Sequence, residues 1–199
     1  MKKIFSLFML TFLMSVGVKA QMPYTLVAPD NFNISIGAGG LINSKIGDED
    51  FSKNYFDMEF TIGKYFNKSV GLSCVFDFAT TGDRYDGNNL YAVGLDLNTR
   101  LTDYYAYSAF DLGLNVGLAY GRFEFKDTYL YSEGMDYVVP KIALDLIINL
   151  TPDKALQMVI EPSYKYYIAT EKMYYIDNGE KVKGNIGALS ILGKLKFNF

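Results

Sequence analysis

The 199-residue chain contains no histidine, no tryptophan and one cysteine, Cys74. Without histidine, it lacks the commonest general base and the commonest metal ligand. A single cysteine cannot form an intramolecular disulfide or a cysteine-rich zinc site. Basic residues are also in the minority, 19 against 22 acidic ones, and the pI is near 5.0. Because such a chain offers no basic footprint for phosphates, we expect no nucleic-acid partner.

The first twenty residues have the three parts of a secretory signal peptide. Residues 1–3 are basic, residues 4–18 are mostly apolar, and residues 18–20 fit a small-x-small cleavage pattern. We therefore expect residues 1–20 to be a signal peptide cleaved near Ala20, and residues 21–199 to form the mature domain. The alternative is an uncleaved anchor helix, but the apolar run is shorter than the ~20 residues that span a bilayer.

Beyond residue 21 the chain repeats its apolar residues with a period of two and without helical spacing. For example, Phe32, Ile34 and Ile36 alternate with Asn33 and Ser35. Such alternation indicates strands with one apolar and one polar face. The pattern recurs in residues 31–42, 56–66, 69–78, 91–100, 110–121, 138–150, 156–168 and 188–199. The sequence therefore predicts an all-β fold of eight strands.

The connections between these segments alternate between short and long. The short ones are residues 67–68, 102–105 and 151–154, and the long polar ones are residues 43–54, 80–89, 126–136 and 170–184. Consecutive antiparallel strands turn at opposite ends, so the short turns share one end and the long loops share the other. This arrangement is typical of a transmembrane barrel, whose closure leaves no backbone group unpaired in lipid. We predict an eight-stranded antiparallel up-and-down transmembrane β-barrel.

The two faces of the strands indicate which side looks into the barrel. Glycine recurs on the polar faces, at Gly37, Gly39, Gly63, Gly71, Gly94, Gly113, Gly117 and Gly121. Glycine weakens a strand and is tolerated where space is short, as inside a narrow barrel. The opposite faces are rich in large apolar residues, with tyrosines near the segment ends at Tyr55, Tyr91, Tyr104, Tyr105, Tyr107, Tyr120, Tyr164 and Tyr166. This pattern indicates an apolar band between aromatic girdles. A soluble barrel with its apolar face inward is the alternative, but so many aromatic side chains would overfill it.

The signal peptide, the eight amphipathic segments and the terminal Lys196, Phe197, Asn198 and Phe199 together resemble a known family. It is the small porin-like outer-membrane β-barrel family, of the OmpX and OmpA transmembrane-domain type. The resemblance implies a monomer in the cell outer membrane, surrounded by outer-membrane lipid. It also implies that Phe197 and Phe199 form an assembly signal that the barrel-assembly machinery reads. Because the chain stops at the last strand, we expect no peptidoglycan-binding domain.

Charged residues recur on the inward phase of most segments. They are the acids Asp57, Glu59, Asp77, Asp96, Asp111, Asp145 and Glu161 and the bases Arg100, Lys141, Lys165, Lys194 and Lys196. Five of these residues lie at similar heights when counted from the short turns: Asp96, Asp111, Asp145, Glu161 and Lys194. Their similar heights predict a mixed-charge layer across the lumen. Buried charges must be paired or hydrogen-bonded, and an eight-stranded barrel is only wide enough for its own side chains. We interpret the network as a plug; the alternative is an ion path or proton relay in a narrow channel for small ions or solutes.

The long loops are where a specific function is expected, since loops on a rigid scaffold carry recognition. Phe123 and Phe125 lie opposite in phase to Tyr120, which we interpret as a phase shift at the start of a projecting hairpin. The candidate binding residues are Phe123, Phe125, Tyr129, Tyr131, Tyr174 and Tyr175. Tyrosine supplies large contact area at low entropy cost, so we expect this surface to bind an extracellular protein or glycan. The alternative is an upper aromatic girdle at the membrane interface.

Little in the sequence supports catalysis. Enzymes that resemble this architecture rely on histidine, and a serine without a partner base does not indicate a nucleophile. The acidic stretches at residues 47–50 and 83–89 lack the regular spacing of a calcium loop. We therefore expect no enzyme, no cofactor and no metal site. The sequence predicts a structural or surface-interaction protein that acts through its extracellular loops.

Overall fold

The structure is a computed structural model that describes residues 32–42, 55–81, 88–102, 108–124, 134–151, 154–174, 179, 181–182 and 184–199. The predicted signal peptide and its cleavage site near Ala20 lie outside these residues, as do most positions of the predicted long loops. No helix formed by the described residues is both long enough and apolar enough to cross a membrane.

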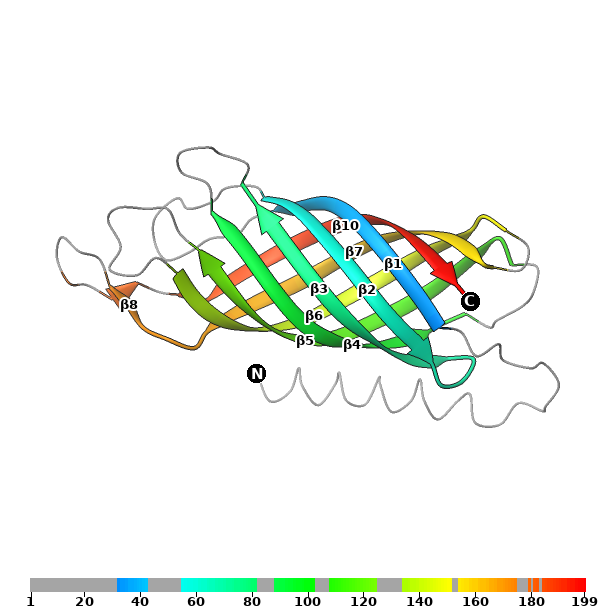
Figure 1. Cartoon of the computed structure of the whole chain (residues 1–199), viewed down its shortest axis with the longest axis horizontal. Coiled ribbons are helices and arrows are strands. Elements are labelled where there is room, and N and C mark those ends of the chain that lie inside the picture. Colours follow the sequence, from blue (N-terminus) through cyan, green and yellow to red (C-terminus); the bar gives the residue numbers. More distant parts are fainter. Residues whose placement is uncertain are drawn as a thin grey trace.

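Eight antiparallel strands form a closed barrel, which confirms the predicted fold class (Figure 1). They are β1 (Phe32–Ile42), β2 (Tyr55–Tyr65), β3 (Val70–Thr80), β4 (Asn89–Arg100), β5 (Phe110–Glu124), β6 (Gly134–Asn149), β7 (Leu156–Ala169) and β10 (Ile186–Asn198). Each pairs with the next along the chain, and β1 pairs with β10 to close the wall. A separate hairpin of β8 (Met173–Tyr174) and β9 (Lys181–Val182) lies between β7 and β10 in the chain.

The strands have two ends, which we name after the predicted connections. The short-turn end includes the start of β1 and the end of β10, and the long-loop end includes the end of β1 and the start of β2 (Figure 1). At the long-loop end, β5 and β6 extend beyond the predicted segments and stay paired from Glu124 and Gly134 onward. The predicted phase shift at Arg122 is wrong, because the alternation of β5 continues unbroken and simply carries Phe123 inward.

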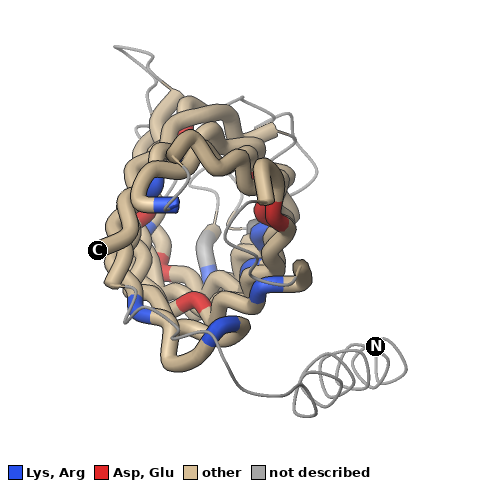
Figure 2. Tube along the Cα trace, turned by 90° about the vertical axis from the view of Figure 1, so that its right-hand side faces the viewer, with Lys and Arg blue, Asp and Glu red and all other residues tan. Residues whose placement is uncertain are grey.

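The apolar side chains face outward and the polar ones face inward. Ile36 is 60% exposed and Leu118 is 58% exposed, whereas Glu59 and Glu161 are each 1% exposed. The soluble alternative, with its apolar face inward, is therefore wrong. Figure 2 shows the closed wall, with acidic and basic residues distributed around it.

Two inward glycines make room for charged side chains. At Gly117 an added Cβ atom would overlap the carboxylate of Asp96, and at Gly37 it would lie 2.5 Å from Cγ of Lys194. Each glycine lies directly opposite the charged residue on the neighbouring strand. Gly117 is paired with Asp96, and Gly37 is paired with Lys194. Inward glycine is therefore required at these positions, because the neighbouring charged side chains already fill the space.

A buried apolar cluster lies inside the barrel towards the long-loop end, and we call it the apolar layer. It consists of Leu41, Tyr55, Ala79, Leu90, Ala92, Phe123, Met135, Tyr137, Val139, Tyr167, Ile186 and Ala188. Tyr55 was expected in the aromatic girdle, but it is 2% exposed and packs in this layer, so that assignment is wrong. The lumen of this barrel is thus polar over part of its length and apolar near one mouth.

Candidate functional site: the charged lumen

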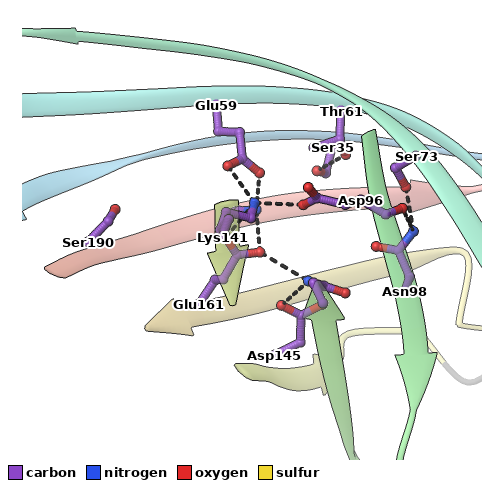
Figure 3. Close-up of polar contacts among 12 residues, drawn as sticks. Ser35, Glu59, Thr61, Ser73, Asp96, Asn98, Lys141, Asp145, Glu161 and Ser190 are labelled. Carbon is purple, nitrogen blue, oxygen red and sulfur yellow. Dashed lines mark hydrogen bonds and ion pairs between the residues drawn. The ribbon is translucent and has the colours of Figure 1, made fainter. Parts of the chain in front are cut away.

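The centre of the lumen holds two lysines among carboxylates from facing strands, which we call the central network. Its members are Glu59, Asp96, Asn115, Lys141, Asp145, Glu161 and Lys194. The Lys141 Nζ atom lies 3.0 Å from Oε2 of Glu59, 2.7 Å from Oδ2 of Asp96 and 3.4 Å from Oε1 of Glu161. Figure 3 shows Glu59, Asp96 and Glu161 converging on Lys141. One ammonium therefore joins β2, β4, β6 and β7 across the barrel.

Lys194 joins the same carboxylates from β10. Its Nζ atom lies 2.5 Å from Oε2 of Glu161 and also contacts Oε1 of Glu59. The two lysines thus share the two glutamates, each taking a different carboxylate oxygen. Each buried glutamate therefore has more than one hydrogen-bond donor. A buried carboxylate needs such donors, because it has lost its contact with water.

Asn115 completes the central network on the side of Asp145. Its Nδ2 atom donates to Oδ1 of Asp145 at 2.9 Å and to Oε2 of Glu161 at 3.3 Å. An amide donor therefore supplements the two lysines, which face four carboxylates in this part of the lumen. Asn115 was absent from the predicted network, because only charged residues were considered.

A second cluster around Lys165 lies between the central network and the apolar layer. The Lys165 Nζ atom lies 3.0 Å from Oδ2 of Asp57 and 2.5 Å from Oδ2 of Asp77. Ser190 donates a hydrogen bond to Oδ2 of Asp57 at 2.5 Å. All three charged side chains are at most 8% exposed, so these ion pairs are screened little by solvent.

The remaining predicted charges lie towards the short-turn end. Asp111 pairs with Lys154 at 2.8 Å and accepts a hydrogen bond from Asn149 at 2.8 Å. The expectation that Asp111 shares a layer with the central carboxylates is therefore wrong, because the stagger of the barrel changes the heights. Arg100 and Lys196 both approach the ring of Tyr65, with Cζ and Nζ at 4.0 and 5.1 Å from its centroid.

The central network lines a small polar cavity. A cavity of about 20 Å³ is lined by its carboxylates and by hydroxyl and amide side chains such as Ser35, Thr61, Ser73 and Asn98. This volume is close to that needed for a single water molecule. Two direct pairs tighten its wall, Ser35 with Thr61 at 2.6 Å and Asn98 with Ser73 at 2.7 Å.

The chemistry of the described lumen is electrostatic pairing. Each lysine of the two clusters contacts carboxylates, and Ser190 donates to Asp57. Within the described part of the chain, no three His, Cys, Asp or Glu side chains are arranged to hold a metal ion. The arrangement is suited to holding facing strands together.

The predicted surface residues separate into three groups. Phe123 is 1% exposed and packs against Tyr55 and Tyr137 inside the barrel, so its assignment to an exposed binding surface is wrong. Tyr174 lies on β8 and is 39% exposed. The other four lie outside the described residues: Phe125, Tyr129, Tyr131 and Tyr175.

The two phenylalanines of the predicted assembly signal both face outward at the short-turn end. Phe197 is 41% exposed and Phe199 is 70% exposed. The Phe199 ring lies 6.4 Å from that of Phe32, and its backbone N–H donates to the Phe32 carbonyl at 2.9 Å. The last residue of the chain is thus fastened to the first described one, next to the seam that closes the barrel.

Comparison with known proteins identifies the fold. No protein-family model matches the chain, and no curated protein matches it in sequence. The solved structure of Neisserial surface protein A is similar, with a TM-score of 0.60 and 12% identity, over 84% of this chain and 97% of that one. A major outer membrane protein from Thermus thermophilus is also similar, with a TM-score of 0.58 and 13% identity, over 85% of this chain and 98% of that one. The chain therefore has the fold of a small outer-membrane β-barrel.

Proposed function

We propose that this chain is an outer-membrane barrel with a closed lumen, which serves a structural or surface-interaction role and catalyses no reaction. The observation that carries the proposal is the contact of Lys141 on β6 with Glu59 on β2, which lie on opposite walls, and the support that Lys194 adds to it. Together these lysines contact carboxylates on β2, β4 and β7. Side chains that meet across the interior from opposite walls are the support for a closed lumen at this level.

The outer surface supports a membrane location. Large apolar side chains on every barrel strand face outward, among them Phe76, Val93, Leu118 and Ile191, which are 46 to 58% exposed. Such a surface is costly in water and favourable in lipid, where a closed barrel satisfies its backbone hydrogen bonds. The short turns would face the periplasm and the long loops the cell exterior, as in other outer-membrane barrels.

Energetics support a plug in preference to a channel. Each lysine of the central network is at most 6% exposed and is surrounded by carboxylates at ion-pair distance. Removing one partner of a buried pair costs about 3–5 kcal/mol, so the network resists disruption by a passing ion. In an eight-stranded barrel the interior is filled by its own side chains.

The surface-interaction role is assigned to the loops at the long-loop end. There the paired ends of β5 and β6 reach Glu124 and Gly134 and form a rigid base for the intervening loop. The hairpin of β8 and β9 adds the exposed Tyr174 on the way to β10. Loops on such a scaffold carry recognition, and tyrosine favours contact with an extracellular protein or glycan.

Two experiments test the proposal. The membrane fraction is extracted in mild detergent, and unboiled and boiled samples are compared on a denaturing gel; a heat-dependent shift in the outer-membrane fraction is expected. The purified barrel is then inserted in a planar bilayer, where no ionic current through the barrel is expected. Steady single-channel conductance would favour the rival function, a narrow channel for small ions or solutes.

The loop role needs a separate test. Residues 126–132 are replaced by a short Gly-Ser loop, which leaves the paired ends of β5 and β6 intact. Cells that display the variant should lose binding to host surfaces while the heat-dependent gel shift is retained. Unchanged binding by a folded variant would contradict recognition by this loop.

A further inference from the structure

The apolar layer has no part in the proposed plug, although it crosses the same lumen. We propose that this layer, and not the charged network, is the barrier that keeps ions and water out at the long-loop mouth. The inference rests on the closed lumen of the proposed function and assigns the closure there to specific residues. In this interpretation the ion pairs hold the wall together and the apolar layer excludes solvent.

The layer is a complete cross-section of the barrel. All eight barrel strands contribute to it, with one residue each from β1, β2, β3, β5 and β7 and more than one from β4, β6 and β10. Every member is at most 5% exposed. No charged side chain belongs to this ring, and its polar side-chain atoms are the hydroxyls of Tyr55, Tyr137 and Tyr167. Asn88 donates to the first of these at 3.4 Å.

Aromatic contacts extend across the middle of the layer. The rings of Tyr55 and Phe123 are 5.7 Å apart, those of Phe123 and Tyr137 are 6.2 Å apart, and those of Tyr137 and Tyr167 are 6.0 Å apart. All three pairs meet edge to face, an arrangement that aromatic rings prefer. The row links β2, β5, β6 and β7, so it joins strands that are not all neighbours.

The outer surface at the same level has the opposite polarity on β5 and β6. Beside the inward Phe123, the outward Arg122 pairs with Asp136 at 3.1 Å, and Tyr120 donates to Asp136 at 2.8 Å. On these two strands an apolar interior lies beneath a polar exterior, which is the pattern of a soluble protein. On β1 and β2 the outward Ile42 and Phe56 keep the outer surface apolar. Lipid does not require an apolar interior here, so the layer needs another explanation, and exclusion of solvent supplies one.

An apolar constriction stops ions more effectively than a polar one. An ion that enters it loses its hydration and meets no charged partner, and such constrictions close channels by dewetting. The region below is different, because the Lys165 cluster and the central network offer charged and hydrogen-bonding partners around a polar cavity. Water that reaches that region finds hydrogen-bonding partners, so the ion pairs oppose the passage of ions but do not keep the region dry.

The experiment measures labelling of a single cysteine placed below the layer. Cys74 is exposed on the outer wall and is first replaced by serine. Ser163→Cys then supplies the reporter, because the Ser163 hydroxyl is buried without a hydrogen-bond partner among the described residues. The barrel is placed in lipid vesicles, and protease cleavage of the long loops in a separate sample shows which end faces outward. A charged, impermeant thiol reagent is then added outside vesicles in which the long-loop end faces outward.

Two variants of the reporter barrel are compared. Phe123→Ala opens the centre of the layer, and Leu90→Ala is a milder second variant in case the first fails to fold. Asp77→Asn is the matched control, because it removes one ion pair of Lys165 without changing the layer. The heat-dependent gel shift shows for each variant that the barrel has formed.

We expect the reporter to be protected in the parent barrel and in Asp77→Asn. In a folded layer variant, labelling should be faster by roughly tenfold or more, which corresponds to a barrier lower by about 1.4 kcal/mol. The inference is overturned if folded layer variants stay protected, or if Asp77→Asn exposes the reporter. Rapid labelling of the parent barrel would also overturn the inference, whereas the closed lumen of the proposed function is tested separately by conductance in the planar bilayer.

Discussion

Lys194 and Glu59 form a buried ion pair inside the lumen, although they lie 135 positions apart in the chain. They belong to β10 and β2, which both pair with β1 and are not paired with each other. The contact therefore spans β1 on the inner side of the wall, where β1 and β10 pair to close the barrel. Breaking it should affect the stability of the closed barrel.

Lys194→Met tests the contribution of this ammonium. The variant leaves Glu59 and Glu161 with Lys141 as their shared lysine. We expect the free energy of unfolding to fall by about 3–5 kcal/mol, because Glu59 and Glu161 each lose one of the two buried ammonium groups that pair with them. Urea unfolding of the refolded barrel, followed by the gel shift, measures the change. Lys172→Met alters an exposed lysine and is the control; equal effects of the two would contradict the prediction.

Gly117→Ala tests the space around Asp96. Its new methyl group would overlap the Asp96 carboxylate, which also pairs with Lys141, so the network must shift. We expect a loss of roughly 1–3 kcal/mol in the free energy of unfolding, typical of overpacking. Gly40→Ala is the matched control, because its methyl group would meet nothing closer than 3.9 Å. Urea unfolding measures the stability of both variants. Equal stability of the two would contradict the prediction that Asp96 fills the space beside Gly117.

Leu118→Arg tests whether the outer wall faces lipid. Leu118 lies on the outward face of β5 and is 58% exposed. We expect a loss of about 2–4 kcal/mol, the cost of arginine on the lipid face near the bilayer midplane. Glu124→Arg, at the long-loop end of the same strand, should cost little. Refolding into lipid vesicles and unfolding in denaturant measures both variants, and a harmless Leu118→Arg would argue against a lipid-facing wall.

Phe199→Ala tests the predicted assembly signal. If the ring is read during assembly, the amount of heat-modifiable barrel in the outer membrane should fall sharply. The stability of the refolded barrel should change much less, because the ring is 70% exposed and packs mainly on Phe32. Phe110→Ala is the control, since Phe110 is 69% exposed at the same end. If both variants reduce the amount of barrel in the outer membrane equally, the effect would be one of aromatic residues in general and not of a signal at Phe199.

Period-two alternation was sufficient to predict most of the fold. It located eight strands, assigned residues such as Glu59 and Lys194 to the inner face, and assigned Ile36 and Leu118 to the outer face. Its errors were local. Tyr55 was assigned to an outward aromatic girdle, and Phe123 was interpreted as the start of a phase shift. Both residues instead lie in the apolar layer inside the barrel.

The partners inside the lumen could not be predicted in the same way. Asp111 and Asp145 stand at similar heights when counted from their turns, yet Asp111 pairs with Lys154 and Asp145 with Asn115. The stagger between strands decides which side chains share a level, and it depends on the closed register of all eight strands. Asn115 and Ser190 carry no charge, so only their positions show that they belong to the clusters.

The sequence by itself determined the strands and the direction of their side chains, because alternation depends only on neighbours along the chain. Only the tertiary structure decided which charges meet and that the lumen changes from polar to apolar. Most strands contribute a single residue to the apolar layer, too few to form a pattern in any one segment. The layer exists because closure of the barrel brings those scattered residues to one level.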